Sequence, residues 1–108
     1  MGSAFVADME GLNDDLIAYA AEVGIEHFLG LTCDPVGGYV MIPCIERNAI
    51  ATLRAMDSSL LAQEVGSIKP NKVSLDMIIN TMNYTGKKIA VELKETSLGG
   101  LATHVPFE

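Results

Sequence analysis

Two cysteines are the residues of this sequence best suited to chemistry. Cys33 and Cys44 stand eleven positions apart, and the segment between them contains Pro35, Gly37 and Gly38. A loop of this kind can wrap a bulky inorganic group, because glycine lets the backbone approach closely and point its N–H groups at the ligand. Thiolates are the side chains that hold iron–sulfur clusters. The pair therefore indicates a candidate metal or cluster site.

The spacing alone leaves three interpretations open: a metal or cluster site, incidental or buried cysteines, and a disulfide. Two thiolates cannot hold a four-iron cluster by themselves, and the pair matches no compact zinc finger. The first residues carry Asp8 and Glu10 and lack the basic region of a secretion signal. We therefore expect a reducing, cytoplasmic location, in which a metal or catalytic role gains weight over a disulfide.

The sequence predicts helices on both sides of this loop. The first is expected to begin near Asn13 or Asp14, whose side chains can cap free backbone N–H groups, and to end at Gly30. Small and apolar residues recur along one face of it at three- and four-residue steps, which favours a closely packed neighbour. They are Leu16, Ile17, Ala20, Ala21, Gly24 and Phe28.

The second helix is expected to start at Pro43, a residue that suits a first helical turn. An apolar stripe runs along it at three- and four-residue steps, formed by Ile45, Ala49, Leu53, Met56 and Leu60. The third helix is expected to start after Ser74 and to run through Gly86 to Leu93. A short strand over residues 89–93 is the alternative, because apolar residues alternate there.

These elements predict an all-α fold, a small helical fragment of a larger helical domain. Residues 1–12 are interpreted as a flexible lead-in and residues 13–108 as the folded portion. The tail from Glu95 is expected to be extended or looped. Met56, Met77 and Met82 are expected to fill gaps in the core.

Composition narrows the classes of partner. The 108 residues include 7 Lys and Arg against 14 Asp and Glu, for a net charge of −7, so neither nucleic acid nor an anionic membrane is an expected partner. Hydrophobic residues make up 49% of a chain this short. We expect some of that apolar surface to face another chain or segment, and the isolated chain to self-associate.

Several blocks resemble one known family in order and spacing. Residues 30–38 (GLTCDPVGG) and 42–49 (IPCIERNA) are similar to the signature of bacterial iron–sulfur-dependent L-serine dehydratases, also called L-serine ammonia-lyases. Residues 26–27 (EH), 73–76 (VSLD) and 94–102 (KETSLGGLA) resemble the same family. The resemblance runs from about Ala20 to Ala102, and it identifies the chain as the C-terminal part of the family's alpha, or catalytic, domain.

The resemblance implies an all-helical catalytic domain with a [4Fe–4S] cluster that converts L-serine into pyruvate and ammonia without pyridoxal phosphate, in serine catabolism and gluconeogenesis. Cys33 and Cys44 correspond to two cluster ligands, and the family's third ligand and its serine-binding motifs lie upstream of this sequence. Three thiolates would leave one iron free to bind the serine hydroxyl as a Lewis acid while a base removes the Cα proton. We therefore expect this chain alone to lack both the cluster and the activity.

Other site residues are weaker candidates. His27 is a candidate base, although a hydrogen-bonding or helix-edge role is the preferred interpretation. Arg47 could hold the substrate carboxylate as a bidentate pair, and Asn48 could hydrogen-bond cluster sulfur or backbone. Thr96 and Ser97 could line the site or simply form a turn.

The expected partners are L-serine, the remainder of the catalytic domain, a beta domain or subunit, and further copies in a homo-oligomer. Whether the parent enzyme is one chain or two subunits stays open. Two other functions are alternative hypotheses. One is a metal-free scaffold or interaction module derived from the enzyme, and the other is a small zinc module that would use Cys33, Cys44, His27 and His104.

Overall fold

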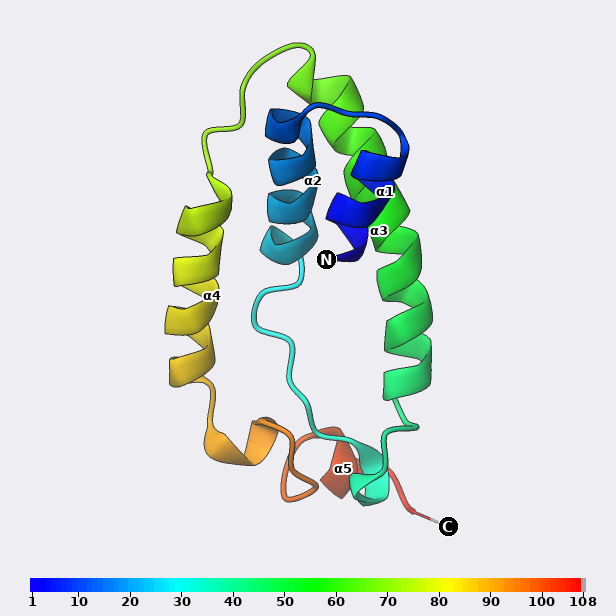
Figure 1. Cartoon of the computed structure of the whole chain (residues 1–108). Helices are drawn as coiled ribbons and strands as arrows, with labels where there is room; N and C mark the ends of the chain where they lie inside the picture. The colour runs from blue at the N-terminus through cyan, green and yellow to red at the C-terminus, as the bar shows by residue number, and fades with distance from the viewer. Residues whose placement is uncertain (108) are drawn as a thin grey trace.

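The computed structural model describes residues 1–107, and it is all-α as predicted (Figure 1). Its helices are α1 (Gly2–Met9), α2 (Asp14–Glu26), α3 (Cys44–Gly66), α4 (Leu75–Lys88) and the short α5 (Leu101–His104). Two 3-10 turns, η1 (Val36–Gly38) and η2 (Val91–Leu93), lie in the connections. Within these residues the only strand-like pairing is one parallel bridge between Cys33 and Lys94.

The helices begin where the capping residues predict. The Asn13 side chain accepts a hydrogen bond from the Leu16 N–H at 2.9 Å, and Ser74 Oγ accepts one from the Met77 N–H at 3.2 Å. Each cap satisfies a backbone N–H that has no partner inside its helix. Helix α3 begins at Cys44, directly after the proline that was expected in its first turn.

The predicted ends of two helices are wrong. Helix α2 stops at Glu26, and Gly30 lies in the turn that follows, with a φ of 80°. Helix α4 stops at Lys88, and the chain then turns through η2 instead of continuing as helix or forming a strand. The Leu93 carbonyl is used by the backbone N–H of Cys33, so a long-range contact takes over from local helix propensity here.

The start of the chain is also not the loose lead-in that the sequence suggested. Residues 2–9 form α1, which packs against both α2 and α3, and Ser3 and Ala7 on it are buried. Glu10 then accepts a hydrogen bond from Ser59 of α3 at 3.1 Å. A helix of eight residues is marginal in water, and tertiary packing stabilises it in a way that local sequence does not reveal.

Small side chains lie at the centre of the contact among α1, α2 and α3, and Leu12, Ile17 and Tyr19 pack around them. Ala7, Ala20 and Ala62 are all completely buried and form one cluster. A Cβ atom at Gly24 would lie only 2.5 Å from Ser3 Oγ, so that glycine allows α1 to approach α2. Ala20 and Gly24 of the face predicted on the first helix lie at this contact, whereas Phe28 lies beyond the end of α2. Both α1 and α3 pack against α2.

The apolar stripe predicted on the second helix does not enter this core. Ser58, Ser59 and Ala62 are the buried residues of α3, whereas the stripe points outward. We call its large exposed side chains the α3 ridge: Ile45, Leu53, Met56 and Leu60, which are 55% to 61% exposed. The methionines expected in the core, at positions 56, 77 and 82, are exposed as well.

The molecule is flat and open for its size. It measures 48 × 26 × 16 Å with a radius of gyration of 16.0 Å, against about 13 Å for a compact domain of this length. Its accessible surface is 7528 Å², whereas a folded monomer of this mass exposes roughly 5,800 Å². Among the residues described, no helix is both apolar and long enough to cross a membrane.

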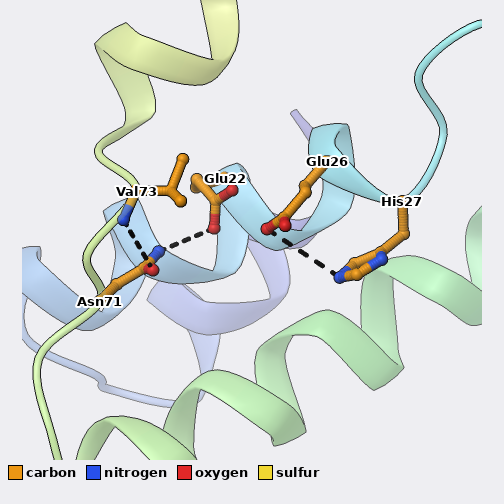
Figure 2. Close-up of polar contacts among 5 residues, drawn as sticks. All are labelled: Glu22, Glu26, His27, Asn71 and Val73. Carbon is orange, nitrogen blue, oxygen red and sulfur yellow. Dashed lines mark hydrogen bonds and ion pairs between the residues drawn. The ribbon is translucent and has the colours of Figure 1, made fainter.

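A buried carboxyl group joins the α3–α4 connection to α2 (Figure 2). Glu22 is 1% exposed, and its Oε2 accepts a hydrogen bond from the Asn71 amide at 2.7 Å. Asn71 in turn accepts from the Val73 N–H at 3.1 Å. Glu22 Oε1 is buried with no hydrogen-bond partner among the described residues.

Burial raises the pKa of Glu22 to about 7, and the neighbouring Glu26 carboxyl raises it further than the Asn71 hydrogen bond lowers it. A protonated carboxyl suits this site because its O–H can donate toward Glu26, which a carboxylate cannot do. The connection is thus held by a group that is neutral up to roughly neutral pH.

We expect the Glu22→Gln variant to remove a pH dependence of stability. The pKa of Glu22 is higher in the folded chain than its ordinary value of 4.5. The contribution of Glu22 to the free energy of unfolding is therefore complete below about pH 4.5 and is lost as the pH rises through about 7. The loss amounts to about 3 kcal/mol at high pH. Urea unfolding followed by circular dichroism should show the variant more stable than wild type at high pH. Glu64→Gln, on the exposed surface of α3, is the control, and identical pH profiles for Glu22→Gln and wild type would contradict this assignment.

Candidate metal centre

The two cysteines lie at different kinds of position at the end of the molecule opposite the Glu22 contact. Both are free thiols. Cys33 is exposed and sits in the extended segment between α2 and η1, while Cys44 is half-buried as the first residue of α3. The N-terminus of a 23-residue helix favours negative charge. Cys44 is therefore placed where a thiolate is stabilised by the backbone.

The segment that follows α4 holds the backbone of Cys33 on both sides. The Cys33 N–H donates to the Leu93 carbonyl at 2.8 Å, and the Cys33 carbonyl accepts from the Thr96 N–H at 3.2 Å. The first of these bonds belongs to the parallel bridge between Cys33 and Lys94 noted above. The block that contains Thr96 thus contacts the Cys33 loop through its backbone, and a role for its side chains in lining the site stays a prediction.

Asp34 connects the same loop to the end of the chain. It is 4% exposed. One carboxylate oxygen accepts from the Leu101 N–H at 2.6 Å and the other accepts from the Thr32 hydroxyl at 2.8 Å. The Leu101 hydrogen bond, followed by the Thr32 hydrogen bond, holds the pKa of Asp34 below its ordinary value. Asp34 is therefore a buried carboxylate that remains charged.

Gly100 makes the Asp34 contact possible. Its φ is 61°, a conformation that residues with a Cβ atom rarely adopt. A Cβ atom there would also clash with the carboxylate of Asp34 and come within 2.9 Å of the Leu93 side chain. Sequence reasoning missed Asp34 as a site residue, although a Thr and an Asp flanking a candidate ligand are a usable signal for hydrogen bonding within a loop.

Arg47 connects the start of α3 to the Cys33 loop. Its guanidinium donates to the Thr32 carbonyl at 2.5 Å. The residue lies in the first turn after Cys44, so this contact places the two cysteine-bearing segments against each other. Binding of a substrate carboxylate by Arg47 stays a prediction. One of its guanidinium N–H groups already donates to the Thr32 carbonyl.

The remaining polar candidates are placed around this arrangement. Ser97 lies beside the glycine turn, because its Oγ would be 3.8 Å from a Cβ atom at Gly38. Thr96 also donates its hydroxyl to the Glu92 carbonyl at 2.5 Å. Asn48 is exposed on α3, and its carbonyl accepts from Thr52. Roles for these side chains in binding substrate stay predictions.

His27 caps the end of α2, ahead of the segment that carries Cys33. Its Nε2 is 4.0 Å from Glu26 Oε2 at the end of α2, and the side chain is exposed (Figure 2). His104 contacts the Gly100 carbonyl at 2.7 Å. Across residues 1–107, no three His, Cys, Asp or Glu side chains are grouped so as to hold a metal ion. The zinc module built on both histidines and both cysteines is therefore not assembled in this chain.

The donor chemistry of the site fits part of an iron–sulfur cluster. Two free thiols are available, one in the loop before η1 and one at the start of α3, and Gly37 and Gly38 within η1 adopt positive φ values of 66° and 77°. A Cβ atom at Gly37 would meet the Phe107 ring at 2.7 Å, whereas one at Gly38 would have no neighbour closer than 3.8 Å, so the open space beside the backbone is at Gly38. A four-iron cluster needs more thiolates than the two of this chain. Cys33 and Cys44 could therefore hold it only together with ligands from outside this sequence.

Comparisons with known proteins identify the family of the chain. Residues 1–102 match the family model described as serine dehydratase alpha chain, which includes the residues once interpreted as a lead-in. The chain is 48% identical over 105 residues to L-serine dehydratase 1 of Escherichia coli and 46% identical over 105 residues to the L-serine dehydratase of Streptomyces coelicolor. It is 57% identical over 86 residues to the L-serine dehydratase of Helicobacter pylori.

These alignments cover 97% of this chain for the first two relatives and 80% for the third, but only 23%, 23% and 18% of the relatives themselves. The chain therefore spans about a quarter of the length of the proteins that it matches. The match along residues 1–102, together with these identities, decides the family. The chain belongs to the serine dehydratase alpha chain family.

Proposed function

We propose that this chain is one part of an L-serine dehydratase, an enzyme that converts L-serine into pyruvate and ammonia. Its relatives carry the name of that activity. The observation that favours the proposal most is the arrangement of Cys33, whose backbone is fixed by hydrogen bonds on both sides while its thiol remains exposed. Such a thiol is free to bind a group that other parts of the protein complete.

The proposed cofactor is a [4Fe–4S] cluster, with Cys33 and Cys44 as two of its ligands and no pyridoxal phosphate. When bound, it supplies a Lewis acid for the departure of the serine hydroxyl. The chain's own residues orient this site: Arg47 holds the Thr32 carbonyl, and the N-terminus of α3 favours negative charge at Cys44. The free donors of Arg47 suit a carboxylate. The general base is not assigned, and His27 stays a candidate for it.

We infer that the isolated chain is inactive, because about three quarters of the length of its relatives lies outside it. That the chain is the carboxyl-end part of the catalytic domain is a proposal that rests on the sequence resemblance alone. The proposed partners are the remaining part of that domain and a beta domain or subunit, and the proposed location is the cytoplasm.

Anaerobic reconstitution with iron and sulfide tests this function. We expect a longer protein that joins this chain to the upstream part of a relative to bind iron and release pyruvate from L-serine, and this chain alone to do neither. Cys33→Ser and Cys44→Ser should each remove most of the iron from the longer protein, because a hydroxyl is a poor substitute for a thiolate. Ser67→Ala, on the exposed end of α3, is the control. Wild-type iron content in both serine variants would contradict the proposal and favour a metal-free scaffold.

The α3 ridge supports the presence of a missing partner surface. Its four side chains repeat at the spacing of one helix face and remain more than half exposed. Exposed apolar surface on this scale marks an interaction site in a protein that stays folded. Because the chain lacks most of the length of its relatives, we propose that the absent part of the same enzyme covers the ridge.

The ridge predicts how the isolated chain behaves. We expect wild type to self-associate, and Leu53→Lys and Leu60→Lys to shift it toward the monomer while helix content is unchanged, because neither side chain packs in the core. The same changes should weaken association with the missing part by about 2 kcal/mol for each leucine that is covered. Light scattering and circular dichroism measure both. Ala51→Lys, at an exposed position on the opposite side of the same helix, is the matched control, and a monomeric wild type would refute the prediction.

A further inference from the structure

We propose that Asp34 is a positioning residue, which fixes the Cys33 thiol by holding the loop at residues 32–34 to the first residue of α5, Leu101. The inference concerns how the thiol is held, and it rests on the proposed function only for what the thiol binds. The hydrogen bonds of Asp34 indicate this role.

Both oxygens of the Asp34 carboxylate are engaged, and they join segments that are far apart in sequence. Leu101, which donates its backbone N–H, is 67 positions away, while Thr32, which donates its hydroxyl, is two positions away. Hydrogen bonds to a charged acceptor are stronger than those between neutral groups. One side chain thus holds together the residue before Cys33, the residue after it and the end of the chain.

We call the hydrogen bonds from Leu101 and Thr32 to Asp34 the clasp. The clasp determines the direction of the Cys33 side chain. The backbone is extended at Cys33, where it forms the bridge with Lys94. Successive side chains of an extended segment point to opposite sides. Asp34 is 4% exposed and Thr32 is partly buried, so the intervening Cys33 side chain is directed outward, as its exposure confirms. Holding Thr32 and Asp34 inward is therefore the same constraint as presenting the thiol outward.

The backbone at Gly100 approaches the Asp34 carboxylate closely, and only a glycine fits there. A Cβ atom at Gly100 would clash with the Asp34 carboxylate, and Gly100 has a positive φ that suits glycine. The Thr32 carbonyl is held separately by Arg47. Loss of Asp34 should therefore release one side of the Cys33 loop while Arg47 keeps the other side attached to α3.

A spin label on a single cysteine tests the proposal in the full chain, without iron. In a Cys44→Ser background the label reports on Cys33, and in a Cys33→Ser background it reports on Cys44. We expect Asp34→Ala to give a distinctly more mobile spectrum at Cys33 and no change at Cys44. Amide hydrogen exchange at Cys33, Thr96 and Leu101 should rise by about tenfold or more, while the amides of α2 and α3 stay protected.

Conservative variants separate positioning from general stability. In Asp34→Asn the amide oxygen can still accept from Leu101, and the amide N–H can donate to Thr32, so we expect mobility between wild type and Asp34→Ala. Thr32→Val, which removes only one contact, should also be intermediate. Asp57→Asn, an exposed aspartate of α3, should match wild type. If Asp34→Ala does not fold, the asparagine and valine variants carry the test.

Two results would overturn the proposal: Cys33 mobility unchanged in every folded Asp34 variant, or equal mobility gained at Cys33 and Cys44. Because these measurements use no metal, they stand apart from iron reconstitution. A rigid Cys33 that still fails to bind iron in the longer protein would reject the proposed function and leave the clasp intact.

Discussion

The close approach of α1, α2 and α3 is the constraint on which the rest of this structure depends. Helices that meet through Ala7, Ala20 and Ala62 pack tightly but bury little apolar surface per contact. The large side chains of α3 consequently have no place inside and form an exposed ridge. Because these helices pack through small side chains, the molecule is flat and exposes more surface than a compact domain of its mass. This shape is expected of a piece of a larger helical domain.

The same three helices leave the cysteine-bearing end of the molecule without a core of its own. Order there comes from hydrogen bonds between the Cys33 loop and the C-terminal segment, chiefly those of Asp34, Thr96 and Leu93. Apolar packing adds a smaller contribution through the stacked rings of Tyr39 and Phe107, whose centroids lie 5.4 Å apart. Directional bonds suit a site that must hold a thiol in one orientation and still leave it open.

Two buried carboxyl groups show how local partners determine charge. Glu22 is removed from water next to another acid, and it has an oxygen without a donor, so the neutral form is favoured. Asp34 is equally hidden from solvent but accepts a backbone N–H and a hydroxyl, so the charged form is favoured. The first secures a connection between helices, whereas the second organises the site. Burial alone would predict the same behaviour for both.

The sequence by itself determined the helical class, the helix starts at Asn13 and Ser74, the cysteine pair and the family resemblance, because caps, periodicity and motifs are local signals. It could not decide where α2 and α4 end, that residues 2–9 are helical, or that the α3 stripe faces outward. The end of α4 depends on the distant contact of Cys33 with Leu93, and the helix at residues 2–9 depends on packing against α2 and α3. Periodicity identifies an apolar face, but only the tertiary arrangement decides whether this chain or another one covers it.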